Sequence, residues 1–253
     1  MSNTFYLLLK YCFLIISVAI FSCQNVEKTT TQKRDISEFY FPIDDLFEGK
    51  VYEYQSVGSE YDPPFYWYYR TLNTGENIYF TGMYYDYNFT PFQFIREEKV
   101  SNGMSLQDFY WYETDTLTNT QNKVDVNITS GNVFPFQVSN PPGVVVSSIN
   151  WKLPEDTLTK MTFIRNRQFD KDTIGLFQNR EVEAIKMNVL ELIDNEQEGH
   201  LEIEYPATEI YAKDIGLIYF EKNISPEHQM KYQLVDIYSM EEFVEKSGVK
   251  LTE

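Results

Sequence analysis

Apolar and polar residues alternate in short runs along most of the chain, and turn-forming residues separate these runs. The clearest case is HLEIEY at 200–205, where the period of two is typical of an antiparallel strand with one buried face. Many short strands with few helices between them predict an all-β fold: an antiparallel, strongly curved sheet, a sandwich or a partly open barrel. We expect strands at 50–55, 65–71, 78–85, 92–100, 108–114, 123–129, 133–138, 144–153, 160–169, 182–193, 200–205, 216–221 and 231–238.

Helical patterning is confined to the C-terminal end. Residues 240–246 are predicted to form one short helix, with Phe243 and Val244 facing inward. Residues 182–193 also have helical propensity, but their β-branched content and the NEQEG turn that follows favour a strand.

The strongest turn signal in the chain is Asn-Pro-Pro-Gly at 140–143. About 215 residues follow the polar N-terminal stretch, a length within range of one all-β domain or two small ones. The β domain is therefore expected over 38–253, either undivided or as two halves with a seam near 139–144.

An aromatic segment at 63–94 contains thirteen Phe, Tyr or Trp residues. If 65–71 and 78–85 form a hairpin around Thr74-Gly75, Trp67 lies opposite Gly82 and fills the space that the glycine leaves. Side chains of the Trp67 parity then form an apolar face, which we expect to be core.

The opposite face of this hairpin is rich in tyrosine, whose ring is apolar and whose hydroxyl needs a partner or water. Such a face suits stacking against sugar rings or contact with a protein partner. Tyrosine is also a good strand-former, so a partly wet surface without a ligand is the alternative. The candidate ligand-binding residues are Tyr66, Tyr68, Tyr79 and Tyr85.

The N-terminus has the pattern of an export signal. Residues 1–22 contain Lys10 followed by an apolar run at 11–21, which is too short for a transmembrane helix of ~20 residues but suits a signal peptide. An uncleaved anchor, lengthened by the apolar residues 5–9, is the alternative. The segment Ile-Phe-Ser-Cys at 20–23 resembles the lipobox of bacterial lipoproteins, although its phenylalanine departs from the usual small residue.

The lipobox resemblance implies that Cys23 carries acyl chains such as palmitate and becomes the new N-terminus. Two or more acyl chains hold a protein stably on a membrane. We therefore expect a signal peptide at 1–22, a lipidated cysteine with a flexible tether at 23–37, and membrane attachment through Cys23.

The net charge of the chain is strongly negative. The formal net charge is −17, and removal of residues 1–22 takes away Lys10 and no acid, which gives −18. Such a charge repels phosphate backbones and anionic head groups, so we expect no nucleic-acid partner.

Catalytic chemistry has few residues to draw on. His200 and His228 are the two histidines, and neither has neighbours at metal-ligand spacing. Nucleophile, phosphate-loop and dinucleotide motifs are missing from the sequence, so we expect no catalytic residue, no metal and no cofactor. A carbohydrate-active hydrolase with two carboxylates is the alternative, with Glu202 and Glu204 or Glu113 and Asp115 as pairs that share one side of a strand.

Three Asp-Thr-aliphatic triplets resemble O-glycosylation sites of exported Bacteroidota proteins. They place candidate modified residues in predicted loops, at Thr116, Thr157 and Thr173.

The entry strand VYEYQ and the segment YAKDIGLIYFEKN at 211–223 resemble β-rich lipoproteins of Bacteroidota, a group to which no activity is assigned. The resemblance implies an exported protein anchored to the outer membrane, periplasmic or surface-facing. We expect a non-enzymatic β domain that acts as a binding or assembly module, with a glycan or an envelope protein as partner.

Overall fold

The computed structural model describes residues 33–114, 120–152, 156 and 158–251. Cys23, Thr116 and Thr157 lie outside the described residues, so the lipid anchor and two of the three glycosylation sites remain predictions. Residues 33–253 cluster as one compact unit, and the turn at 139–143 joins two strands within it.

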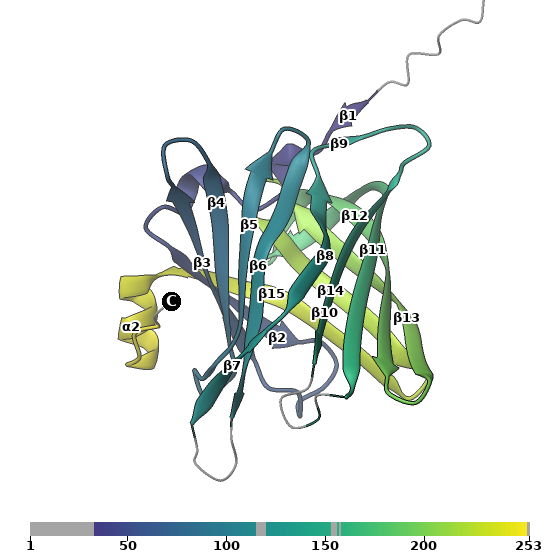
Figure 1. Cartoon of the computed structure of the whole chain (residues 1–253). Coiled ribbons are helices and arrows are strands. Elements are labelled where there is room, and N and C mark those ends of the chain that lie inside the picture. Colours follow the sequence, from purple (N-terminus) through teal and green to yellow (C-terminus); the bar gives the residue numbers. More distant parts are fainter. Residues whose placement is uncertain (1–32, 115–119, 153–155, 157, 252–253) are drawn as a thin grey trace, which may run out of the picture. The chain divides into compact units, whose positions relative to one another are not determined.

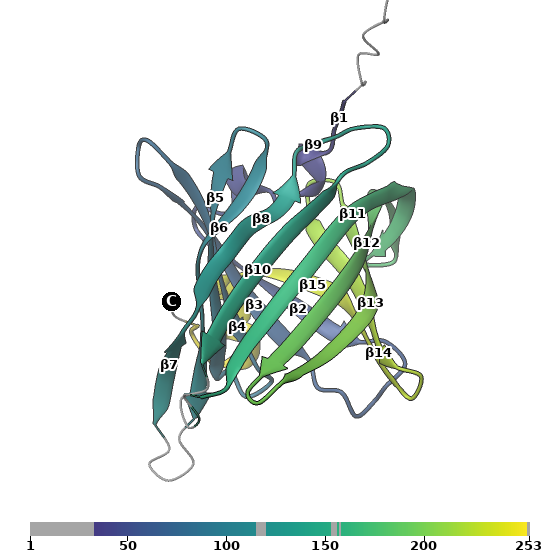
Figure 2. The same ribbon diagram turned by 45° about the vertical axis from the view of Figure 1, so that its right-hand side comes forward.

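The fold is all-β and antiparallel, as the alternating pattern predicts (Figures 1 and 2). Twelve strands of the described chain follow one another around a closed, barrel-like sheet in the order β5-β4-β3-β2-β15-β14-β13-β12-β11-β10-β8-β6, and β6 pairs back with β5. A thirteenth strand, β7, pairs antiparallel with the C-terminal part of β6, from Tyr110 to Thr114. The strands are β2 (Lys50–Ser56), β3 (Phe65–Asn73), β4 (Ile78–Tyr85), β5 (Pro91–Val100), β6 (Gly103–Thr114), β7 (Gln121–Asp125), β8 (Asn127–Pro135), β10 (Val144–Lys152), β11 (Lys160–Phe177), β12 (Arg180–Glu196), β13 (His200–Ala212), β14 (Gly216–Ser225) and β15 (His228–Ser239).

Several strands are longer than the patterns predict. The 182–193 segment is confirmed as a strand, and β8 continues through Ser130-Gly131-Asn132, which we expect to be a turn. That turn expectation is wrong because Ser130 and Gly131 pair with β10, and the Ser130 hydroxyl donates to the Val146 carbonyl at 2.8 Å.

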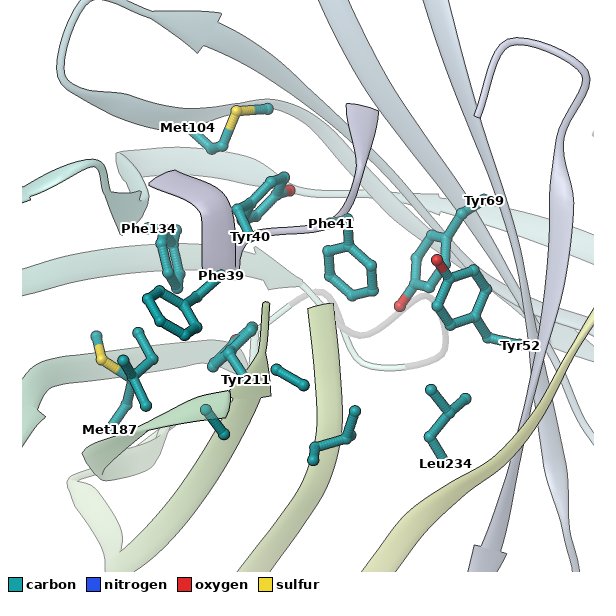
Figure 3. Packing of buried hydrophobic residues seen from close by; sticks show 14 of the residues in the cluster. Phe39, Tyr40, Phe41, Tyr52, Tyr69, Met104, Phe134, Met187, Tyr211 and Leu234 are labelled. Carbon is teal, nitrogen blue, oxygen red and sulfur yellow. The ribbon is translucent and has the colours of Figure 1, made fainter. Parts of the chain in front are cut away.

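An N-terminal segment fills one end of the closed sheet. It contains β1 (Arg34–Asp35), which pairs with β9 (Gln137–Val138), and two short 3-10 helices, η2 (Ser37–Phe39) and η3 (Ile43–Asp45). We call residues 36–46 the plug, because most of its apolar side chains are buried inside the sheet (Figure 3). The predicted end of the tether at residue 37 is slightly late, since Ile36 is fully buried.

Rings of the plug meet rings of the surrounding strands. Phe41 stacks on Phe80 with centroids 4.9 Å apart, and Tyr40 contacts Phe134 at 5.3 Å. Figure 3 shows Phe39, Tyr40 and Phe41 projecting from the plug among side chains of the sheet. Burial of this apolar area stabilises the closed end by about 25 cal/mol per Å² removed from water.

The predicted C-terminal helix is confirmed as α2 (Met240–Ser247), which lies outside the sheet beside β2 and β3 (Figure 1). A capping box starts it: the Glu242 backbone N–H donates to the Ser239 hydroxyl, and the Ser239 N–H donates to the Glu242 carboxylate. Gly248 ends it in the left-handed conformation at φ 72°. Among the described residues, none of the helices combines the length and apolar character needed to cross a membrane.

The aromatic hairpin forms from β3 and β4, but its register differs from the expected one. Tyr69, not Trp67, lies opposite Gly82, and Trp67 lies opposite Tyr84. The shift is two residues, so each side chain keeps its predicted face. A Cβ at position 82 would lie 2.7 Å from Tyr69 Cε1, so Tyr69 fills the space that the glycine leaves.

Candidate functional site

A cavity of about 360 Å³ lies inside the closed sheet, against the inner side of the plug. Tyr40 and Phe41 of the plug form part of its wall, and inward-facing side chains from strands around the sheet form the rest. Ligand pockets usually range from about 300 to 1,000 Å³, so the volume suits a small molecule.

Aromatic side chains of β3 and β4 form one side of the cavity. Phe65 and Tyr84 stack with centroids 5.0 Å apart, and Trp67 contacts Tyr84 edge to face at 5.4 Å. All three line the cavity, and they belong to the face that the alternation assigns to the core. The prediction that this face of the hairpin lies inside the protein is correct, but the face also borders a cavity.

Cationic side chains from β11 and β14 form another part of the wall. Arg165 Nε lies 2.6 Å from Glu191 Oε1, and Lys222 Nζ lies 2.9 Å from Glu191 Oε2. Burial alone would raise the pKa of Glu191, but Arg165 and Lys222 lower it to about 2. Glu191 therefore stays ionised throughout the physiological range.

A second ion pair lies deeper. Arg167 forms a two-point contact with Glu209, through Nε at 2.7 Å and Nη2 at 3.2 Å, and the Tyr211 hydroxyl donates to Glu209 at 3.0 Å. Burial opposes ionisation of both partners, yet their mutual attraction lowers the pKa of Glu209 and raises that of Arg167. Such bidentate pairs are among the strong polar contacts of proteins.

Glu97, the second buried acid that lines the cavity, forms no ion pair among the described residues. It accepts a hydrogen bond from the Tyr40 hydroxyl at 2.6 Å, which joins β5 to the plug. Burial raises the pKa of Glu97 to about 7, against the hydrogen bond from Tyr40 and the more distant charges of Arg167 and Arg165. Glu97 therefore changes its protonation state near neutral pH.

The four tyrosines predicted as ligand contacts lie on the other side of the sheet. Tyr66 and Tyr85 are buried in a cluster with Phe243 of α2, and Tyr68 packs against the same cluster. Tyr79 receives a hydrogen bond from Asn77 and lies beside the Arg96 guanidinium. None of the four lines the cavity, because their side chains lie on the outer face of the sheet, where α2 packs over Tyr66 and Tyr85.

Sequence reasoning missed the charged residues of the cavity, although they leave a signal. Arg165 and Arg167 share the parity of Phe163 and Phe169, so two charges interrupt an apolar strand face. Glu191 and Glu209 interrupt the inward faces of β12 and β13 in the same way. A charge at a core parity position predicts either a buried ion pair or a polar cavity.

Other candidates lie elsewhere. Thr173 pairs with Ala184 inside β11, so the expectation that it lies in a loop is wrong, while its glycosylation stays a prediction. Glu202 and Glu204 are exposed on β13, and Asp115 lies outside the described residues.

His200 has more acidic neighbours than its sequence spacing indicates. It meets Asp194 at 2.9 Å, and ligand atoms of both lie within 4.8 Å of one on Glu202. Asp194 raises the pKa of His200. The cluster is largely exposed at the β12–β13 turn. The contact between His200 and Asp194 explains why these side chains lie close together.

No protein-family model matches the chain, and no curated protein sequence matches it. Solved structures with a similar fold include a putative lipoprotein from Parabacteroides distasonis, 13% identical, which covers 78% of this chain and 95% of its own at a TM-score of 0.51. A putative exported protein with a YmcC-like fold from Bacteroides fragilis is 12% identical and covers 79% and 98%, at a TM-score of 0.49.

The Parabacteroides protein is a putative lipoprotein from a member of the Bacteroidota, the group that the sequence resembles. At 13% identity, the likeness to the Parabacteroides protein shows a shared fold.

Proposed function

We propose that this chain is an envelope lipoprotein whose closed β sheet is a non-enzymatic binding module for a small ligand held in the interior cavity. The cavity carries the proposal, because it combines an aromatic wall with polar groups that converge on one internal space. The cysteine at position 23 after an export-type signal, and the fold shared with a putative lipoprotein, support the envelope location.

The buried charges favour binding over a purely structural role. A buried ion pair costs several kcal/mol of desolvation per ion, and well-packed apolar residues of similar volume are often at least as stabilising. Five acidic or basic side chains nevertheless line this cavity: Glu97, Arg165, Arg167, Glu209 and Lys222. Fold stability alone does not explain why the cavity contains these groups, whereas binding of a ligand through them does.

The buried acids also bear on the hydrolase alternative. A glycosidase needs two carboxyl groups that are available to the substrate, one as acid and one as base or nucleophile. In the cavity, Glu209 is held by Arg167 and Tyr211, and Glu97 accepts from Tyr40. These contacts support a binding function.

A neutral fluorescent probe, N-phenyl-1-naphthylamine, tests for a working cavity. We expect saturable binding to the wild-type protein, because the cavity offers aromatic surface inside the closed sheet. Gln93→Trp places a large ring at a lining position on β5 and is expected to weaken binding by about tenfold or more.

The matched control is Gln107→Trp, the same change at an exposed position on the neighbouring strand β6. It is expected to leave probe binding within about twofold. Non-saturable binding, or equal effects of the two variants, would contradict a binding cavity.

The lipid anchor has its own test. Cys23→Ala is expected to release the protein from membranes, and membrane retention would refute the anchor.

A further inference from the structure

The cavity presents positive charge even though the whole chain is strongly acidic. Arg165 and Lys222 both line the cavity, and their side chains are 25% and 22% exposed. Glu191, which pairs with both, is 1% exposed and is not among the residues that line the cavity. A molecule in the cavity therefore meets the two cations and not their counter-ion.

The charges of this triad do not cancel. Two cations share one carboxylate, which leaves one positive charge next to the cavity. Burial lowers the pKa of Lys222, and repulsion from the Arg165 guanidinium lowers it further, against the attraction of Glu191. A second anion at this place would relieve the repulsion.

The remaining acids of the cavity are occupied. Glu209 neutralises Arg167 at 2.7 Å, and Glu97 bonds to the Tyr40 hydroxyl. Glu97 is also the acid that burial brings close to its neutral form at neutral pH. The excess positive charge is thus confined to the Arg165–Lys222 pair.

Apolar surface extends from these cations across the space. Arg165 lies over the Phe163 ring at 5.2 Å, and Met230 and Tyr232 of β15 also line the cavity near Lys222. The aromatic side chains Phe65, Trp67 and Tyr84 form the wall of β3 and β4. The arrangement is complementary to a molecule with one anionic end and an apolar face.

We infer that the ligand of this cavity is a small amphipathic anion, whose carboxylate or phosphate binds between Arg165 and Lys222 while its apolar face packs on the aromatic wall. This inference rests on the proposed binding function and specifies its ligand class. An acidic sugar and a short acyl carboxylate share this chemistry.

Two probes with the same aromatic skeleton test the inference. 8-Anilinonaphthalene-1-sulfonate carries an anionic group, and N-phenyl-1-naphthylamine lacks it. Lys222→Met removes one cation but leaves Glu191 paired with Arg165. We expect it to weaken binding of the sulfonate probe by about tenfold and to change binding of the neutral probe by less than about twofold.

Lys231→Met is the matched control. Lys231 pairs with Glu221 on the opposite face of the same two strands, so the variant loses the same charge without touching the cavity. It is expected to leave both probes unaffected. Thermal unfolding of both variants checks that each is folded at the assay temperature.

The outcomes separate the two proposals. If neither probe binds the wild-type protein, the binding function fails. If both bind and Lys222→Met affects them equally or not at all, the binding function stands and the anionic ligand is refuted.

Competitors then distinguish the sources of the anion. Displacement of the sulfonate probe by a glucuronate disaccharide indicates an acidic sugar, and displacement by dodecanoate indicates an acyl carboxylate. Equal displacement by the neutral counterparts, an uncharged disaccharide and dodecanol, would overturn the inference.

Discussion

The two faces of the β3–β4 hairpin contain the same kinds of ring but lie in different surroundings. On the outer face, Tyr66 and Tyr85 are sealed beneath α2 with Phe243. On the inner face, Trp67 and Tyr84 border a cavity that also contains cations. Aromatic content alone therefore does not distinguish a ligand surface from a core, because the covering element decides which face stays available.

The comparison also separates two kinds of energetic role. Rings under α2 stabilise the fold through close packing, and their removal leaves a void. Rings beside the cavity already border empty space, so their contribution is divided between packing and contact with a ligand. Variants on the two faces are expected to change different measurements.

The largest effect is expected from Phe243→Ala. Phe243 is 1% exposed and contacts Tyr66, Phe89 and Tyr238 with ring centroids 5.4 to 6.0 Å away. Loss of this ring should lower the free energy of unfolding by about 3–5 kcal/mol, measured by urea denaturation. Neutral-probe binding of the folded variant should persist, because the cavity lies on the other face. A loss under about 1 kcal/mol would show that α2 does not seal the outer face.

Glu97→Gln tests how the stability of the inner face depends on pH. Burial raises the pKa of Glu97 from 4.5 to about 7. The protonated carboxyl group therefore makes its full contribution to the stability of the fold below pH 4.5, and this contribution is lost as pH rises through 7. At pH 8 this loss amounts to about 3 kcal/mol, which Gln at this position avoids.

Denaturation at pH 5, 6.5 and 8 measures this effect. The wild-type protein should lose stability across the series, and Glu97→Gln should lose less and be the more stable protein at pH 8. Parallel pH profiles for the two proteins would refute the assignment to Glu97.

Gly82→Ala tests how tightly Tyr69 packs beside the plug. The new Cβ would lie 2.7 Å from Tyr69 Cε1 and 3.1 Å from Ile95 Cγ1, so we expect a loss of about 1–3 kcal/mol in unfolding free energy. Gly143→Ala is the control, because nothing lies within 4 Å of its added Cβ. Equal effects of the two substitutions would rule out the observed hairpin register.

The smallest effect is expected from Ser239→Ala, which removes the N-cap of α2. The lost hydrogen bond to the Glu242 N–H should cost about 1 kcal/mol of unfolding free energy. Glu242→Gln keeps an acceptor for the Ser239 N–H and should cost less. A larger loss for Glu242→Gln than for Ser239→Ala would mean that the charge of Glu242, and not the N-cap, stabilises the start of α2.

The pattern of apolar and polar residues predicted the fold class, the C-terminal helix and the two faces of the hairpin. It could not predict which face α2 covers, since α2 lies more than 150 residues after β4 and contacts it only in the folded state. The hairpin register was wrong by two residues, an error that preserves parity and is invisible to a period-two pattern.

The cavity was beyond the sequence for a related reason. Its wall combines side chains from strands far apart in the chain, such as Trp67 on β3 and Lys222 on β14, which meet only because the sheet closes. The plug also lacks any clear periodicity, so residues before 38 read as tether although Ile36 is buried.

Closure of the sheet also limits how the molecule can associate with copies of itself. A strand with an unpaired side can recruit a strand from another chain, which leads to aggregation. Within the described part of the closed sheet, β7 is the strand with a single neighbour. Its exposed positions carry Gln121, Asn122, Lys123 and Asp125, polar residues that disfavour such recruitment. The free side of β7 is therefore a poor template for a strand from a second copy of the chain.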